Sequence, residues 1–378
     1  MAFKKICFIS HNATRTGAPI VLYNFIKWLK EKHKFQIETW FIEGGEMLGE
    51  FELLCTCNLL KRSSSNRWLG LTHRGTNKLF KKDVLLETRL KGLAVFDLLF
   101  FNTIASFKLI PLLPKLKKTQ CIAYLHEQPF SINAQYHNYL TKKNLNAFRK
   151  ILTVSDITKK YLVKEWGIAD DTISIIPPFV NIKSMLSRDS EEANTELVPV
   201  NSFNVGGCGL QDWRKGPDLF IKVASLFKKN YPGLQIKFTW IGGESSMTSA
   251  LEYELDQFKL KNDVTFTGAV QNPSEWFNQF DVFLLTSRED PFPLVVIEAC
   301  AGKIPVICFR GIGDITNLVK TIPENVVDYC DIDAMAERIL FYYENKNLIA
   351  VHGTRLQKEI RQYDTQSGAP KLYEALLN

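Results

Sequence analysis

The stretch that decides the fold of this chain is Val282–Ala299, VFLLTSREDPFPLVVIEA. It begins with four apolar residues, Val282–Leu285, which have the length and composition of a buried strand. A polar, acidic loop follows, and Pro293 suits the first turn of a helix. The pattern therefore predicts a strand, a loop and a helix N-terminus, the repeating unit of parallel α/β sheets.

The loop and the helix start also have the features of an anion site. A helix N-terminus offers free backbone N–H groups and the positive end of the helix dipole, and both favour phosphate. Asp290 lies in the loop and Glu298 lies early on the helix, and ionised carboxylates accept hydrogen bonds from hydroxyl groups. We expect Asp290 to contact a sugar and Glu298 to bind a ribose diol. The alternative is a simple turn and a helix-dipole interaction, because carboxylates are common near helix starts.

The same unit recurs in both halves of the 378-residue chain. In the first half, strands are expected at 5–10, 35–42, 95–101, 121–125 and 151–154, with helices at 18–32, 104–113 and 137–149. In the second half, strands are expected at 203–208, 236–240, 264–266, 282–285 and 306–308, with helices at 217–228, 247–260, 293–301 and 334–343. We therefore predict an α/β protein of two tandem Rossmann-like doubly wound domains that face each other across a cleft. Their expected bounds are 1–178 and 201–355, and the polar segment 179–200 is expected to link them.

A second candidate phosphate site is GGCGLQDWRKGP, residues 206–217, which we expect to be a glycine-rich turn after the first strand of the second domain. Glycines allow a ligand to approach the backbone, and Arg214 and Lys215 would neutralise a diphosphate. The segment is not a Walker A loop, because the Gly-Lys-Ser/Thr order is absent. A surface turn with two solvated cations is the alternative.

The first domain carries two weaker signals. Residues 14–19, TRTGAP, follow the first strand as a phosphate loop would, but they contain one glycine, and a helix-starting turn is the alternative. His126 lies just past a strand end in YLHEQ, where the edge of a cleft is expected, and this favours a site residue over a core histidine. The D-x-D at 331–333 precedes an amphipathic helix, so N-capping is expected there, and no metal is expected.

The net charge of +7 is concentrated in residues 57–92, which contain nine Lys or Arg residues and only two acidic ones. Such a patch attracts phosphate groups, on a membrane surface or on an anionic glycan, although a solvated loop is an equal alternative. No recognised nucleic-acid motif surrounds it, so no nucleic acid is expected as a partner. The cysteines lack metal-ligand spacing, and we find no signal sequence or apolar run of spanning length. We therefore expect a cytoplasmic protein, with peripheral attachment to the inner face of a membrane as a hypothesis.

Taken together, these motifs resemble those of the family-4 retaining glycosyltransferases of the GT-B fold. The resemblance is most specific in four segments: WRKG at 213–216, WIGG at 240–243, FTG at 266–268 and the acidic stretch at 290–298. The E-x7-E motif of the family corresponds to Asp290 and Glu298, with Asp in place of the first Glu, and the phosphate lysine corresponds to Lys215. The family often has an arginine six residues before that lysine; this position is Gly209, and Arg214 is a candidate replacement.

The resemblance implies a retaining transferase that moves a hexose-type sugar from a nucleotide-diphosphate donor to a glycan or lipid-linked acceptor, in surface polysaccharide or lipopolysaccharide assembly. It implies no metal and no cofactor other than the nucleotide sugar as co-substrate. A helical tail at 356–378 that packs on the first domain is also expected. A nucleotide-sugar epimerase of the same fold and a non-catalytic sugar-nucleotide-binding protein remain as alternatives.

The implied site residues fall into two groups. The catalytic residues are expected to be His126, Asp290 and Lys215. The donor-binding residues are expected to be Gly17, Ala18, Gly209, Arg214, Lys215, Gly268, Ala269, Val270, Asp290, Phe292, Pro293, Leu294, Val295 and Glu298. Within this set, the nucleotide base is expected to meet the backbone of 268–270, and backbone N–H groups of 292–295 are expected to meet the diphosphate and sugar.

Overall fold

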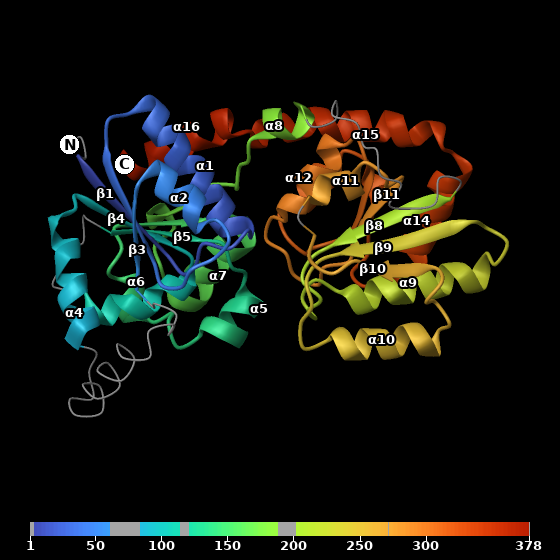
Figure 1. Cartoon of the computed structure of the whole chain (residues 1–378), viewed down its shortest axis with the longest axis horizontal. Helices are drawn as coiled ribbons and strands as arrows, with labels where there is room; N and C mark the ends of the chain where they lie inside the picture. The colour runs from blue at the N-terminus through green and yellow to red at the C-terminus, as the bar shows by residue number, and fades with distance from the viewer. Residues whose placement is uncertain (1–3, 61–83, 114–120, 188–201, 271, 378) are drawn as a thin grey trace. The chain divides into compact units, whose positions relative to one another are not determined.

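The computed structural model describes residues 4–60, 84–113, 121–187, 202–270 and 272–377 (Figure 1). It divides into two units: Met1–Val180 together with Thr365–Asn378, and Asn181–Asp364. Each unit is a parallel sheet with helices packed against it. Residues 61–83, which hold most of the basic stretch, lie outside the described residues.

The sheet of the first unit has seven strands in the order β3-β2-β1-β4-β5-β6-β7. The strands are β1 (Lys5–Ser10), β2 (Gln36–Phe41), β3 (Thr56–Leu59), β4 (Leu98–Asn102), β5 (Cys121–Leu125), β6 (Lys150–Thr153) and β7 (Ile173–Ile175). They pair in parallel, and β1, β4 and β5 are almost entirely buried, as their continuous apolar runs predict. The strand order reverses between β1 and β4, so the loops after these two strands diverge and leave room for a site.

The helices of the first unit are less regular than its strands. They are α1 (Gly17–Lys32), α2 (Leu48–Leu54), α4 (Val84–Lys91), η1 (Gly92–Val95), η2 (Ile104–Leu112), α5 (Pro129–Ser131), η4 (Ile132–Tyr136), α6 (Lys142–Leu145), α7 (Asp156–Trp166), η5 (Asp170–Thr172) and α16 (Thr365–Leu377). The helix predicted at 104–113 is a 3₁₀ helix, and Pro111 within it lacks a backbone donor.

The helix predicted at 137–149 is wrong over most of its length, because only Lys142–Leu145 is helical there. Its side chains instead hydrogen-bond the local backbone. The Thr141 hydroxyl accepts from the Asn144 N–H at 3.1 Å, and the Asn144 amide donates to the Tyr139 carbonyl at 2.7 Å. Such bonds compete with helix continuation.

The sheet of the second unit has six parallel strands in the order β10-β9-β8-β11-β12-β13. The strands are β8 (Phe203–Cys208), β9 (Ile236–Ile241), β10 (Val264–Phe266), β11 (Val282–Leu285), β12 (Val306–Phe309) and β13 (Val326–Val327). The helices are α8 (Ile182–Ser187), α9 (Pro217–Asn230), α10 (Thr248–Gln257), α11 (Pro273–Phe277), α12 (Leu294–Ala301), α13 (Thr316–Val319), η7 (Pro323–Asn325), α14 (Ile332–Glu344), α15 (Asn347–Glu359) and η8 (Ile360–Tyr363). Asp331 caps α14 by accepting from the Ala334 N–H at 2.9 Å, which confirms the N-cap prediction.

The prediction that Gly206 and Gly207 belong to a phosphate-binding turn is wrong, because both lie inside strand β8. Aromatic side chains pack so close to both positions that there is no space for a Cβ atom. A Cβ atom on Gly206 would lie 2.1 Å from the Phe280 ring, and one on Gly207 would lie 2.7 Å from the Trp240 ring. These glycines therefore make room for aromatic side chains.

Helices α8 and α16 lie outside the sheets, and each packs against a helix of its own unit. Helix α8, within the segment expected as a linker, packs against α12 in the second unit. Helix α16 packs against α1 in the first unit, and a Cβ atom on its Gly368 would lie 2.5 Å from the Phe179 ring. Over the described parts of the chain, no helix is both long and apolar enough to cross a membrane.

Candidate active site

The candidate active site of the second unit is built from loops at the carboxyl edge of its sheet. The loop after β8 (209–216) and the loop after β11 (286–293) bond to each other: the Arg288 N–H donates to the Arg214 carbonyl at 2.8 Å, and the Thr286 hydroxyl donates to the Gly216 carbonyl at 2.9 Å. Gly216 has a φ of 71°, and a Cβ atom on it would lie 2.1 Å from the Thr286 carbonyl oxygen. Glycine is therefore required for the two loops to meet.

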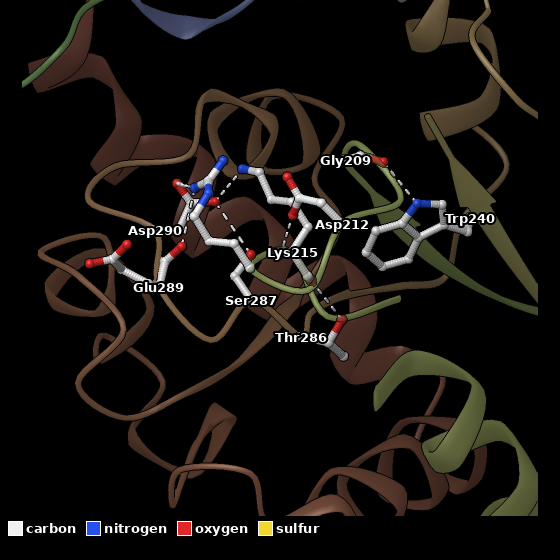
Figure 2. A network of polar contacts seen from close by, with 9 residues as sticks. Gly209, Asp212, Lys215, Trp240, Thr286, Ser287, Glu289 and Asp290 are labelled. Atoms are coloured by element: carbon white, nitrogen blue, oxygen red, sulfur yellow. Dashed lines mark hydrogen bonds and ion pairs between the residues drawn. The ribbon is translucent and has the colours of Figure 1, made fainter. Parts of the chain in front are cut away.

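Two cations surround one buried carboxylate where these loops meet (Figure 2). The Lys215 ammonium donates to Asp290 Oδ2, and the Arg214 guanidinium lies 3.8 Å from Asp290 Oδ1. The Ser287 hydroxyl donates to Asp290 Oδ2 at 3.3 Å. Only 4% of Asp290 is exposed. The structure thus brings together three of the residues that the sequence analysis selected, Arg214, Lys215 and Asp290, and the group carries a net positive charge.

The backbone holds this group in place. The Asp290 N–H donates to the Ile312 carbonyl at 2.9 Å, and a Cβ atom on Gly313 would lie 1.9 Å from the Asp290 carbonyl oxygen. The Asp212 carboxylate accepts from the Lys215 N–H at 2.9 Å. Neither the loop that carries the two cations nor the loop that carries Asp290 can therefore shift without breaking these hydrogen bonds, and a fixed arrangement suits a site that binds a charged group.

The structure explains why Gly209 stands where relatives often have an arginine. The Gly209 carbonyl accepts from the Trp240 indole N–H at 2.8 Å (Figure 2), and a Cβ atom on Gly242 would lie 1.9 Å from the same carbonyl oxygen. A Cβ atom at position 209 would itself lie 3.0 Å from the Lys215 side chain. Arg214, the candidate replacement, donates to the Glu289 carbonyl at 3.1 Å.

Helix α12 places Glu298 near the end of β8. The helix begins at Leu294, and its N-cap residue, Pro293, makes no side-chain capping bond, so the N–H groups of the first turn have no side-chain cap. Glu298 is half-buried on the same helix. Burial and the Glu298 carboxylate together raise the pKa of the Cys208 thiol to about 12, while Lys215 opposes the rise. Glu298 and Lys215 therefore both lie close to Cys208, the last residue of β8.

The other residues of this unit that were predicted to bind the donor lie at the same carboxyl edge of the sheet. The turn that contains Gly268, Ala269 and Val270 follows β10, and the Gly268 carbonyl accepts from the Gly242 N–H at 3.0 Å. The side chains of Phe292 and Leu294 are buried, and the Phe292 ring packs on Tyr363 at 4.8 Å, so residues 292–295 offer mainly backbone groups to a ligand.

Sequence reasoning missed an ion pair that supports the cationic loop. Arg288 donates to both carboxylate oxygens of Asp218, at 2.8 and 2.6 Å, and to the Trp213 carbonyl at 2.7 Å. Burial alone would raise the pKa of Asp218, but the bonds from Arg288 lower it on balance. Two features of the sequence could have predicted this ion pair: an acidic residue in the first turn of α9 and an arginine in the loop after β11.

In the first unit, His126 joins a chain of hydrogen bonds that ends at the start of α1. Its Nε2 lies 3.0 Å from Asn102 Oδ1, and the Asn102 amide nitrogen donates to the Ala18 carbonyl at 3.2 Å. The structure therefore brings Ala18 and His126 together through Asn102, while Gly17 is exposed at the start of the helix. Asn102 was missed, although it is the polar end of an otherwise apolar strand, LLFFN.

Glu127 fixes the backbone next to His126. Its carboxylate accepts from the His126 N–H at 3.0 Å and from the Ile104 N–H at 3.1 Å. Burial raises the pKa of Glu127 to about 7, although these backbone donors oppose the rise. Burial, together with the neighbouring His11, lowers the pKa of His126 to about 3. The His126 imidazole is therefore neutral near pH 7.

Comparisons with known proteins identify the kind of domain that the second unit forms. Residues 203–345 match the family Glycosyl transferases group 1. Over 153 residues the chain is 30% identical to a D-inositol 3-phosphate glycosyltransferase of Paenarthrobacter aurescens, a match that covers 39% of this chain and 37% of that protein. The chain thus spans little more than a third of the length of that relative.

Two other relatives match over longer stretches. Alpha-galactosylglucosyldiacylglycerol synthase of Streptococcus pneumoniae is 27% identical over 289 residues, which cover 71% of this chain and 74% of that protein. The O-antigen biosynthesis glycosyltransferase WclY of Escherichia coli is 23% identical over 316 residues, which cover 80% and 79%. The chain thus has relatives in glycolipid and O-antigen synthesis.

Among solved structures, Anabaena HepE in complex with UDP and glucose has the same fold, with a TM-score of 0.76, 16% identity and coverage of 99% of this chain and 100% of HepE. This likeness and the two parallel sheets confirm the prediction of two Rossmann-like domains. The group 1 match also spans the loops that hold Arg214, Lys215, Asp290 and Glu298. The second unit therefore carries a group 1 glycosyltransferase domain, and the chain is similar to the family-4 glycosyltransferases and has the GT-B fold.

Proposed function

We propose that this protein transfers a hexose-type sugar from a nucleotide-diphosphate donor to a glycan or lipid-linked acceptor, with retention of the anomeric configuration. The observation that carries the proposal is the group formed by Lys215, Arg214 and Asp290 beside the start of α12. Two cations on one loop, next to a helix N-terminus without a side-chain cap, suit a diphosphate.

The donor diphosphate would change the partner of Lys215. In the structure, the Lys215 ammonium is bound to Asp290. A diphosphate brings more negative charge than one carboxylate, so it competes for Lys215 and Arg214 and leaves Asp290 able to accept hydrogen bonds from sugar hydroxyls. A neutral sugar alone has no charge with which to compete. Occupation of the sugar site is therefore coupled to binding of the diphosphate.

The transfer step needs no protein nucleophile. The bond between the anomeric carbon and the diphosphate oxygen breaks, a bond from the acceptor oxygen forms on the same face, and the acceptor proton passes to the leaving diphosphate. Lys215, Arg214 and the N–H groups of α12 stabilise the charge that develops on the leaving group. Because these groups supply the countercharge, we propose that transfer requires no divalent metal and no cofactor.

The other selected residues bind the rest of the donor in this proposal. Glu298 binds the ribose diol, and the backbone of 268–270 contacts the base. In the first unit, His126 positions the sugar, and the α1 start at Gly17 and Ala18 contacts its phosphate side; these roles rest on the family resemblance. HepE binds UDP and glucose, which makes UDP-sugars the first donors to test.

A lipid-linked acceptor is favoured by the two longer relatives, whose names refer to a diacylglycerol glycolipid and to O-antigen. We propose that the protein works in the cytoplasm at the inner face of a membrane, in the assembly of a surface glycan. The basic stretch at 57–92 would attract the anionic surface.

A donor screen followed by product analysis tests the proposal. Thermal shifts with a panel of UDP-, GDP- and ADP-sugars identify the donor, since a ligand that binds the folded protein stabilises it. Transfer to lipid-linked acceptors is then followed by proton NMR, which reads the anomeric configuration of the product. An inverted product would contradict retention, isomerised donor without acceptor would indicate an epimerase, and tight donor binding without turnover would indicate a binding protein.

A further inference from the structure

The inference concerns Asn102, which ends strand β4 in the first unit and is fully buried. The strand register places it opposite Ser10 of β1 and opposite Tyr124 of β5, so it lies between the loops that carry the start of α1 and His126. Its side chain bonds in both directions, to the Ala18 carbonyl at 3.2 Å and to His126 Nε2 at 3.0 Å.

These two contacts determine which atoms carry hydrogen. A backbone carbonyl only accepts, so the Asn102 atom that faces Ala18 must be the NH₂ group. The atom that faces His126 is then the amide oxygen, which also only accepts. His126 Nε2 must therefore carry the ring proton, and in a neutral imidazole Nδ1 is left with a free lone pair.

The surroundings of His126 leave Nδ1 ready to accept a hydrogen bond. The ring packs against Tyr124, with 4.2 Å between ring centroids. Among the residues that the structure describes, none hydrogen-bonds Nδ1 of His126. Two residues further along the chain, the Gln128 side chain is 3% exposed, and its amide nitrogen has no partner in the described part of the chain.

We propose that Asn102 is a positioning residue that fixes His126 as the Nε2–H tautomer, so that Nδ1 accepts a hydrogen bond from a hydroxyl of the donor sugar. The nature of that ligand rests on the proposed function, whereas the tautomer does not. In this state His126 has no proton to give at Nδ1 and acts as an acceptor. It therefore selects a sugar hydroxyl at this position and transfers no proton in the reaction.

The charged and titratable groups around the ring keep it neutral. His11, from the loop after β1, bonds the Thr103 hydroxyl at 3.0 Å, and Lys108 of η2 lies near His11. The Glu127 carboxylate is directed to backbone N–H groups. Burial and His11 both lower the pKa of His126. The Nε2–H tautomer should therefore persist across the range in which histidines ordinarily titrate, about pH 5 to 8.

NMR of the histidine rings tests the proposal directly. The whole protein is labelled with ¹⁵N at histidine, two-bond proton–nitrogen correlations report the state of each ring nitrogen, and the spectrum of His126→Gln assigns the signals of His126. We expect a protonated Nε2 and an unprotonated Nδ1 that do not change between about pH 5 and 8. An Nδ1–H tautomer, or an imidazolium at pH 6, would overturn the proposal.

Substitution of Asn102 gives a second test. Asn102→Leu removes both hydrogen bonds, and we expect mixed tautomers and a kcat about tenfold lower, the effect of one lost hydrogen bond. Asn102→Asp places a carboxylate against Nε2, so the pKa of His126 should rise and kcat should fall at low pH, where Nδ1 becomes a donor.

The matched control is Asn144→Leu, which removes another buried amide of the same unit, one that donates to the Tyr139 carbonyl. It should leave the His126 signals unchanged. If Asn102→Leu keeps both the tautomer and kcat of the wild type, Asn102 has no positioning role. If the Asn102 variants do not fold, the tautomer of the wild-type ring decides. The expected tautomer in a protein that transfers no sugar would refute the proposed function alone.

Discussion

Replacement of Lys215 by methionine separates its contribution to folding from its contribution to transfer. The change keeps most of the apolar stem and removes the ammonium that bonds Asp290. The side chains of Lys215 and Asp290 are only 16% and 6% exposed, so the carboxylate would remain buried with the Arg214 guanidinium at 3.8 Å and the Ser287 hydroxyl at 3.3 Å. Breaking a buried pair by removing one partner costs about 3–5 kcal/mol, and because Arg214 remains we expect the lower end of that range.

The double variant Lys215→Met/Asp290→Asn distinguishes the two contributions. Replacing the carboxylate with a neutral amide removes the uncompensated buried charge, so about half or more of the lost free energy of unfolding should return. The kcat should stay low, because the Lys215 ammonium is still missing from the site of the leaving diphosphate. Loss of one such stabilising group lowers kcat by about 100- to 1000-fold. Urea denaturation followed by circular dichroism measures stability, and turnover at saturating donor measures kcat.

The matched control is Lys222→Met, which removes a partly exposed cation 3.9 Å from Asp218 on α9. Stability and kcat of this variant should stay close to those of the wild type. Two results would refute the reasoning. A kcat near the wild-type value in Lys215→Met would remove the lysine from the leaving-group site, and a double variant no more stable than Lys215→Met would show that the ion pair does not contribute to folding.

Four further outcomes are expected. Glu298→Gln should weaken binding of the free nucleoside diphosphate about tenfold, and Asp290→Asn should lower sugar transfer more than nucleotide affinity; calorimetric titration of both variants would expose the reverse assignment. The pKa of Glu127 is raised to about 7 from an ordinary value of 4.5, so between these two values the folded state keeps a proton that the unfolded chain loses. This contribution to stability is therefore lost as the pH rises through about 7. Glu127→Gln should flatten that pH dependence in thermal denaturation. Transfer should persist in a chelator, and activity restored only by magnesium or manganese would contradict this. Binding to anionic vesicles in co-sedimentation should decline with salt and with neutralisation of Lys81 and Lys82, whereas no binding at low salt would favour a soluble acceptor.

The sheets were predictable because they are parallel and buried on both faces. Strands such as β4 (LLFFN) and β11 (VFLL) are short, mainly apolar runs, and runs of that length between turn signals identify such strands. The helices of the first unit were harder, because Thr141 and Asn144 bond their own backbone within a segment whose composition fits a helix. Gly206 and Gly207 were misread for a related reason. Glycine serves both phosphate loops and close ring packing, and the rings of Phe280 and Trp240 come from distant segments.

The members of the candidate site were predictable, but their partners were not. Lys215 and Asp290 were each selected from their local sequence, yet they are 75 positions apart, and only the folded sheet brings their loops together. Asn102 illustrates the opposite case. A single asparagine at the end of a strand is an ordinary strand terminus in a sequence, and its role follows only from the two neighbouring loops that it joins.

The departure from the family pattern at Gly209 has a structural explanation in the backbone around it. Gly209 accepts a bond from Trp240 and lies against Gly242, so its backbone is committed to holding β8 and β9 together, and an arginine cannot take its place without displacing Lys215. Arg214, the candidate replacement, lies toward the opposite end of the same loop, 3.8 Å from Asp290. A leaving diphosphate requires countercharge, and that charge can come from any residue whose loop reaches it. The requirement that this chain keeps is therefore two cations around one acid, whichever positions provide them.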